Sequence, residues 1–280
     1  MLKKLTANEA ICRIDFAYAA SKNKSKTSYP IFIDGIHTQN DFAKYYKKCA
    51  TADNYKTLSF TNGAAQGIAQ FFYLPDDKYL QLCGFYTDGS ASEMLEELLQ
   101  YMSKRFPSYS LYLGFPAENA QACELLLSRG FFVAESSYHD VMQLSDYAAP
   151  NGALRAYKIK KADFGVFEKL HTADDDTYWT SEHVFDTFDE WNIYAVADKG
   201  GDAAGVLMER GGEIYGVDYA NSEFDGEVFK ALVGAALTGM KNVGIEYTTF
   251  FNDEQTQPFT LQLGFRSIGR YVLYVRHADV

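Results

Sequence analysis

The sequence is poor in the features that mark membrane, metal-binding and secreted disulfide-rich proteins. No window approaches the run of about 18 uncharged apolar residues that a membrane-spanning helix needs. The first residues are basic, but Arg13 and Asp15 interrupt the apolar run of a signal peptide, so we expect a cytoplasmic protein. The four cysteines show no C-x-x-C spacing and the five histidines do not cluster with them, which indicates reduced thiols and no metal site.

Positive charge is also scarce. The chain has 26 Lys and Arg against 37 Asp and Glu, a net charge of −11. The deficit is concentrated in residues 151–280, with 12 basic and 21 acidic residues (net −9), against 14 and 16 in residues 1–150 (net −2). Such acidity repels polyanions, so we expect no nucleic-acid partner, and it suits a small cationic molecule better. The alternative interpretation, which applies to more proteins, is that the acidity serves only solubility.

Apolar residues make up 47% of the chain, enough for two cores of ordinary size. Each half shows the same predicted order of strands, helix, strand, helix and strand. Turn residues at 146–154 indicate a short linker between the halves. We therefore predict two α+β domains, residues 1–147 and 153–280, each with a mixed, mostly antiparallel sheet flanked by helices.

In both halves, an asparagine is followed by a predicted helix that ends in Gly-Phe. In the first half Asn119 and Ala122 precede Gly130 and Phe131; in the second, Gly264-Phe265 follows Asn252, which sits one residue early in this spacing. The pattern resembles the GNAT superfamily of N-acetyltransferases, in a tandem arrangement that covers nearly the whole chain. The resemblance implies two GNAT-like acyl-CoA N-acyltransferase domains with acetyl-CoA as co-substrate and no metal.

The resemblance also implies a phosphate-binding loop in each half. This loop precedes the first helix in the order strands, helix, strand, helix and strand, and main-chain N–H groups at a helix N-terminus suit an anion. The first half has the sequence from Tyr86 to Ala91, which lacks the family's leading Gln or Arg, and the second has three acids between Glu223 and Val228. The predicted cofactor-binding residues are Tyr86, Gly89, Ser90, Ala91, Asn119, Gly226 and Asn252.

The tyrosine that many family members use as a general acid is missing, because its position holds Leu126 in the first half and Thr260 in the second. We therefore predict Tyr219, just past the second central strand, as the acid and Glu209, on the strand before it, as the base. Both residue types also suit purely structural roles at these positions. Among the histidines, His171 is the one next to an acidic run.

That acidic run follows the first helix of the second half, where the family's acceptor-binding loop lies. Carboxylates beside aromatic rings hold an ammonium group by charge and by cation–π contact, although a solvated loop explains the run as well. The predicted substrate-binding residues are Asp174, Asp175, Asp176, Tyr178 and Trp179.

These features favour an N-acetyltransferase that transfers the acetyl group of acetyl-CoA to a primary amine of a small cationic molecule. The alternative is a catalytically degenerate acyl-CoA-binding or regulatory protein of the same fold. An aminoacyl transferase that uses charged tRNA is disfavoured by the acidity. We expect a small-molecule amine as partner, no nucleic acid or membrane, and a monomer or a homodimer.

Overall fold

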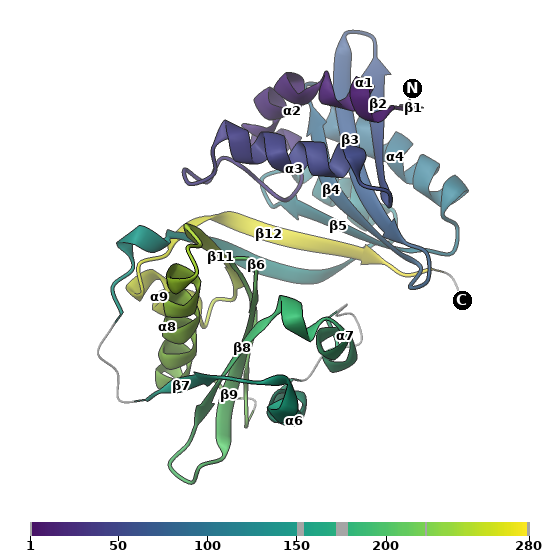
Figure 1. Ribbon diagram of the computed structural model, residues 1–280. Helices are drawn as coiled ribbons and strands as arrows, with labels where there is room; N and C mark the ends of the chain where they lie inside the picture. The colour runs from purple at the N-terminus through teal and green to yellow at the C-terminus, as the bar shows by residue number, and fades with distance from the viewer. Residues whose placement is uncertain (1, 150–153, 172–178, 222, 279–280) are drawn as a thin grey trace. The chain divides into compact units, whose positions relative to one another are not determined.

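The chain folds into two compact units (Figure 1). This computed structural model describes residues 2–149, 154–171, 179–221 and 223–278. The first unit comprises Met1–Ser136 with Gly269–Val280, and the second comprises Ser137–Ile268. Each unit holds a mixed, mostly antiparallel sheet flanked by helices, which confirms the predicted fold class.

The sheet of the first unit has a parallel pair in an otherwise antiparallel arrangement. Its strand order is β1 (Leu2–Lys4), β2 (Tyr55–Asn62), β3 (Ala65–Leu74), β4 (Tyr79–Thr87), β5 (Ser110–Pro116) and β12 (Arg266–Arg276). The parallel pair is β4 with β5. The short edge strand β1 was not predicted, because three residues show too little alternation to indicate a strand.

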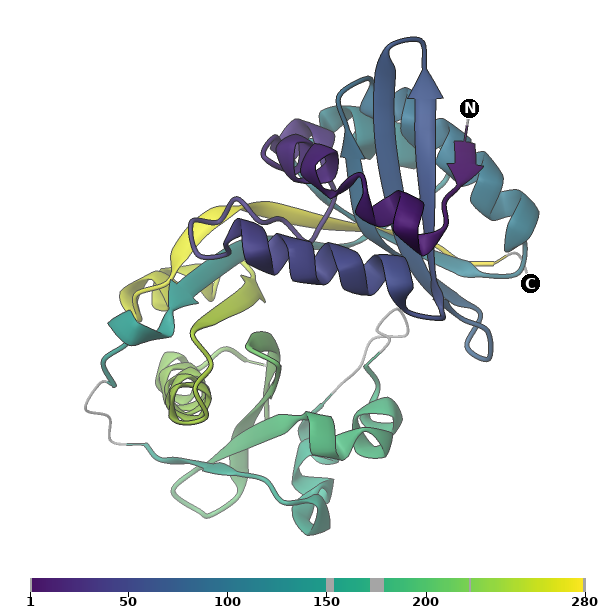
Figure 2. The same ribbon diagram turned by 45° about the horizontal axis from the view of Figure 1, so that its top comes forward.

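Helices cover both faces of this sheet. Its helices are α1 (Ala7–Ile11), α2 (Ile14–Ser21), α3 (Gln39–Thr51), α4 (Ala91–Arg105) and α5 (Ala120–Ser128). Side chains alternate along a strand, so Tyr86 of β4 packs into the cluster of α1 to α3, whereas its neighbour Phe85 packs into that of α4 and α5 (Figures 1 and 2). Ser90 caps α4 by accepting the N–H of Glu93.

The second unit repeats this arrangement. Its strand order is β6 (Phe132–Gln143), β11 (Tyr247–Asn252), β10 (Glu213–Tyr219), β9 (Ala203–Arg210), β8 (Asn192–Ala197) and β7 (Ala156–Lys158), with β10 and β11 parallel. The long helix α8 (Gly226–Asn242) packs on one face. The short helices α6 (Gly165–Leu170) and α7 (Ser181–Asp186) pack on the other.

The helix that leads to the second Gly-Phe is shorter than predicted. Helix α9 runs only over Gln257–Gln262, with Pro258 in its first turn. Proline has no N–H to donate and is tolerated at that position, so it marks the helix start. Before it, the Asp253 carboxylate accepts the N–H groups of Gln255 and Thr256 and forms a separate turn.

The last strand of each sequence half lies in the sheet of the other unit. Strand β6, from the first half, pairs with β11, and β12, from the second half, pairs with β5. The predicted ranges 1–147 and 153–280 describe the sequence repeat and stay a prediction, whereas the compact units exchange these strands. In the part of the chain that the structure describes, none of the helices is both long and apolar enough to cross a bilayer.

Candidate functional site

In each unit the central strand separates from its parallel neighbour just before a β-bulge. The pairing of β4 with β5 ends at Gln81, and that of β10 with β11 ends at Ile214. The bulged residue is Cys83 on β4 and Tyr215 on β10, and a glycine follows each, Gly84 and Gly216. Beyond a bulge the ladder is disrupted, so main-chain groups facing the gap need other partners.

In the first unit the chain's own backbone fills this gap. The Ser28 N–H donates to the Phe85 carbonyl of β4 (3.1 Å), and the Tyr29 N–H donates to the Gly114 carbonyl of β5 (3.0 Å). Thr27 also forms an antiparallel bridge with Tyr86. The segment 27–29 therefore joins β4 to β5 beyond the point where the two strands part.

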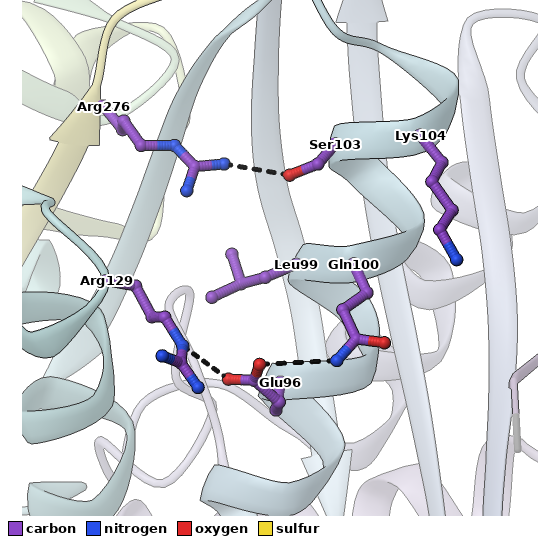
Figure 3. A pocket seen from close by; sticks show the side chains of 7 residues that line it. All are labelled: Glu96, Leu99, Gln100, Ser103, Lys104, Arg129 and Arg276. Carbon is purple, nitrogen blue, oxygen red and sulfur yellow. Dashed lines mark hydrogen bonds and ion pairs between the residues drawn. The ribbon is translucent and has the colours of Figure 1, made fainter.

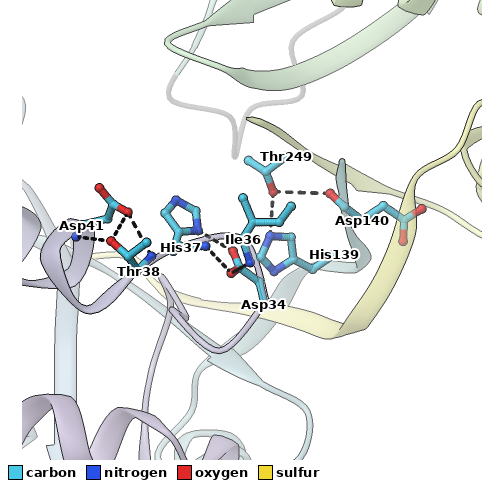
Figure 4. Close-up of polar contacts among 8 residues, drawn as sticks. All are labelled: Asp34, Ile36, His37, Thr38, Asp41, His139, Asp140 and Thr249. Atoms are coloured by element: carbon cyan, nitrogen blue, oxygen red, sulfur yellow. Dashed lines mark hydrogen bonds and ion pairs between the residues drawn. The ribbon is translucent and has the colours of Figure 1, made fainter. Parts of the chain in front are cut away.

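Side chains hold both ends of this segment. Upstream, Lys26 Nζ donates to the Gly89 carbonyl. Downstream, Asp34 Oδ1 accepts the N–H groups of Ile36 (2.9 Å) and His37 (2.8 Å), and its Oδ2 contacts the His37 ring (Figure 4). The filled gap is thus part of the first unit's folded core.

The predicted cofactor residues of the first half also have internal partners. Asn119 Nδ2 donates to the Thr27 carbonyl (3.1 Å), while its Oδ1 accepts the Ala122 N–H at the start of α5. The Gly89 N–H donates to Thr87 Oγ1 (3.0 Å), and the Ala91 N–H donates to the Gln121 side chain (3.0 Å).

Two further predicted residues of this loop are used in the same way. Ser90 Oγ accepts the Glu93 N–H, and Tyr86 is fully buried, with its ring 3.0 Å from where a Cβ on Gly84 would lie. The cofactor role of this loop stays a prediction, but its geometry does not favour it, since the N–H groups at Gly89 and Ala91 are already paired.

The second unit differs at the same place. Around a Cβ placed on Gly216, no atom of the described residues lies within 4 Å, apart from Gly216 and its two chain neighbours. Nor does any main-chain hydrogen bond between described residues join β10 to β11 after Ile214. Asp218 shares this face of β10 with Gly216, because it lies two residues further along. Space for a ligand group is therefore available beside the second central strand.

Comparison with solved structures identifies the fold of the chain. Among solved structures, a GCN5-related N-acetyltransferase from Sphaerobacter thermophilus matches with a TM-score of 0.66 and 13% identity, over 100% of this chain and 96% of that one. The chain has the fold of the GCN5-related N-acetyltransferases. At such identity the likeness concerns the fold, and no protein-family model or curated protein matches the sequence.

Two further structures agree with this fold. A Drosophila protein matches with a TM-score of 0.62 and 10% identity, over 99% of both chains. The glucosamine N-acetyltransferase region of a fungal multi-domain GH3 β-N-acetylglucosaminidase matches with a TM-score of 0.58 and 12% identity, over 99% of this chain but only 38% of that one. The predicted resemblance to the GNAT superfamily is thus confirmed at the level of the fold.

Tyr219, the predicted acid, lies at the end of β10 in the second unit. Its ring packs against Phe224, and its hydroxyl is buried without a hydrogen-bond partner among the described residues. Burial, together with the nearby charges of Asp253, Asp225 and Asp218, raises the pKa of Tyr219 well above its usual value. The hydroxyl therefore stays protonated.

Asn252, at the end of β11, belongs to a buried polar cluster that sequence reasoning missed. Its Nδ2 donates to Asp140 Oδ2 (2.9 Å), to which the Thr260 hydroxyl also donates (2.5 Å). Among the described residues, Oδ1 of Asp140 and Oδ1 of Asn252 have no hydrogen-bond partner. Asp140 lies on β6. The Thr249 hydroxyl of β11 donates to the main-chain carbonyl of Asp140 and contacts the ring of the neighbouring His139 (Figure 4). The sequence signal for this cluster was a charged residue, Asp140, within the apolar end of β6.

The start of α8 is unfavourable for the phosphate end of an acyl-CoA. Asp225 Oδ1 accepts the N–H groups of Glu227 (2.9 Å) and Val228 (3.1 Å), and a Cβ on Gly226 would lie 2.5 Å from the Phe259 ring. A carboxylate thus occupies the donors that a pyrophosphate would use, and like charges repel. The predicted role of Gly226 stays a prediction that this geometry does not favour.

Glu209, the predicted base, lies near the end of β9, beside the start of β10. It is fully buried, with Oε2 accepting from Asn192 Nδ2 (2.7 Å) and Oε1 from the Gly212 N–H (3.0 Å). Oε1 therefore stabilises the turn between β9 and β10, and Oε2 joins β9 to the start of β8. A catalytic role for Glu209 stays a prediction, and the structure places this carboxylate at the strand end opposite Tyr219.

His171 reaches β10 from the end of α6. Its Nδ1 contacts Asp218 Oδ2 (2.9 Å) and its Nε2 contacts the Trp179 carbonyl (2.8 Å). Burial disfavours the charged ring, but the Asp218 carboxylate and the Trp179 carbonyl outweigh it and raise the pKa of His171 above its usual value. Since both partners accept hydrogen bonds, the imidazolium form is the one that satisfies them.

This ion pair makes stability depend on pH. A raised folded-state pKa means that the pair stabilises fully below the unfolded pKa of about 6.5, and that this contribution is lost as pH rises through the folded pKa. We expect His171→Gln to lower the urea-unfolding free energy more at about pH 5.5 than at about pH 9. An equal loss at both pH values would contradict the ion pair.

The predicted acceptor residues fall mostly outside the described residues, namely Asp174, Asp175, Asp176 and Tyr178. Trp179 is described, and its ring packs edge-on against Trp191 (5.0 Å between centres). The Arg210 guanidinium lies 5.0 Å from the centre of the Trp179 ring. That ring already holds a cation of the protein itself, so substrate binding by Trp179 stays a prediction.

Proposed function

We propose that the chain is an acetyl-CoA-dependent N-acyltransferase and that the acetyl group is transferred in the second unit. The observation that carries the proposal is the contrast between the two gaps. The first is filled by residues 27–29, whereas the second has no described atom within 4 Å of a Cβ on Gly216. A thioester arm entering beside β10 would meet the unpaired main chain after the bulge, where N–H groups can stabilise the oxyanion.

Tyr219 supplies the second part of this chemistry. The amine nitrogen attacks the thioester carbonyl carbon, the C–S bond breaks, and the departing thiolate takes a proton from the Tyr219 hydroxyl. The proton that the amine loses returns through water to Tyr219, so the step balances. The high pKa of Tyr219 keeps it protonated before each turnover.

The charge around this site supports a cationic acceptor. Asp218, Asp225 and Asp253 all lie near enough to Tyr219 to influence its pKa. Their summed field favours a cation over an anion or an uncharged molecule, and the acidity of residues 151–280 acts in the same direction. We therefore infer a small polycationic molecule with a primary amine as acceptor, such as a polyamine or an aminoglycoside.

The test combines binding with turnover. We expect acetyl-CoA to raise the melting temperature of the full chain and to release free thiol, measured with a thiol-reactive dye, when a polyamine or an aminoglycoside is present. Absence of both effects across the panel of amines would refute the proposal.

A degenerate acyl-CoA-binding protein remains the second candidate, because Asp225 and Gln121 occupy the donors at the two helix starts where the phosphates of an acyl-CoA were predicted to bind. Stabilisation by acetyl-CoA without thiol release would favour this candidate over the enzyme.

A further inference from the structure

The first unit carries a hollow of about 400 Å³ on the side of α4 (Figure 3). Three elements form its walls: α4, the end of α5 and the end of β12. Its volume is within the range of small-molecule sites. None of its lining residues belongs to the predicted acyl-transfer machinery.

Two arginines reach across the hollow toward α4. Arg129 follows α5, and its Nε donates to Glu96 Oε2 (2.8 Å). Arg276 ends β12, and its Nη2 donates to Ser103 Oγ (3.2 Å). Figure 3 shows both guanidinium groups on the same side of α4, with Leu99 between them.

The guanidinium groups are held in place before any ligand arrives. That of Arg276 lies over the Phe131 ring, 4.7 Å from its centre. Glu96 fixes Arg129 through Nε, and no described residue bonds to the two terminal nitrogens of Arg129. A planar fork with free terminal donors suits an oxyanion, and little entropy is lost when its position is already set.

The charge of this hollow opposes that of the chain. Arg129, Arg276 and Lys104 line it together with one carboxylate, Glu96, in a protein of net charge −11. The Glu96 carboxylate is neutralised by Arg129 and also accepts from Gln100. The lining residues thus include three cationic side chains and one carboxylate, a balance that favours an anion.

The hollow also has an apolar floor. Leu99 is almost fully buried, and in Figure 3 it lies between the two arginines. The lining of the hollow as a whole is mainly apolar, so a bare inorganic anion would leave this surface in water, whereas an apolar body would cover it. The second half has Leu263 in place of Arg129 before its Gly-Phe, so the feature belongs to the first unit and not to the repeat.

We propose that this hollow binds a small organic oxyanion, a carboxylate or a phosphate on an apolar body. The oxyanion lies between the terminal nitrogens of Arg129 and the guanidinium of Arg276, and the body lies on Leu99. This site is independent of acyl transfer in the second unit. The first unit then serves as a ligand-binding unit, although its strand gap is filled.

The experiment titrates the full chain with benzoate, phenyl phosphate and inorganic phosphate by calorimetry at constant ionic strength of about 0.1 M. We expect saturable binding of benzoate or phenyl phosphate with a Kd of about 1 mM or lower, and at least about tenfold weaker binding of inorganic phosphate. The comparison of benzoate with phenyl phosphate identifies the oxyanion. No saturable binding of either aromatic probe would overturn the proposal, and inorganic phosphate binding as tightly as phenyl phosphate would overturn the role of Leu99.

Variants locate the site. Arg129→Gln with Arg276→Gln is expected to weaken binding at least about tenfold, while Lys47→Gln, which removes one positive charge from α3, leaves it unchanged. Ser103→Glu, at an exposed position on α4, places a carboxylate beside Arg276 and is expected to compete with the ligand. If the double variant fails to fold, Ser103→Glu still shows whether the ligand binds in this hollow. Unchanged affinity in Ser103→Glu and in any folded double variant would place the ligand elsewhere.

Discussion

Replacing Gly216 with leucine is expected to lower kcat/KM for acetyl transfer at least about 100-fold, because misplacing reacting groups by about an ångström has an effect of that size. A Cβ on Gly216 meets no described atom within 4 Å, so the side chain fits the fold and occupies the space that we assign to the reacting groups. The measurement is thiol release from acetyl-CoA with the amine found in the screen, together with the melting temperature.

The matched control is Gly165→Leu at the first residue of α6, where a Cβ also meets no described atom. It should retain wild-type turnover. Full activity in a folded Gly216→Leu variant would show that the acetyl group is transferred elsewhere.

Replacing Asp225 with asparagine is expected to tighten acetyl-CoA binding about tenfold, the result of removing one like charge beside a phosphate. Asparagine caps a helix as well as aspartate does, so α8 should keep its start and the protein its stability. Calorimetric titration of both proteins with acetyl-CoA measures the effect. Because the gain is electrostatic, it should shrink as salt is added.

The control for this variant is Asp163→Asn, which removes the same charge from the short helix before α6. Its affinity should equal that of the wild type. If Asp225→Asn binds acetyl-CoA no better than Asp163→Asn, the carboxylate at α8 does not oppose the phosphates.

Local signals in the sequence predicted the repeated parts of the fold well. The alternation in β2 to β4, the capped helix α4 and the two Gly-Phe helix ends all depend on residues close together in the chain. Gly130 and Gly264 both adopt positive φ at those helix ends, as the pattern requires.

Pairings between distant residues were not predictable in this way. The exchange of β6 and β12 leaves the alternation of each strand unchanged, so nothing in either segment indicates its partner. The same holds for residues 27–29, whose hydrogen bonds reach Phe85 and Gly114.

The site residues show the same division between local and distant signals. Asp225 directly before a glycine and an apolar helix is a readable N-cap, and the structure gives it that role. The partners of Glu209 and Asn252 depend on residues from neighbouring strands, Asn192 and Asp140. Residue type alone therefore predicted a base at Glu209, where tertiary contacts give the carboxylate a structural role.

The most direct test of the account is a crystal structure of the chain with acetyl-CoA, with the number of bound molecules checked by calorimetry. We expect one acetyl-CoA per chain, its thioester beside Gly216 between β10 and β11, and residues 27–29 unchanged between β4 and β5. Acetyl-CoA between β4 and β5, with residues 27–29 displaced, would contradict the central claim that the second unit carries the acyl-transfer site.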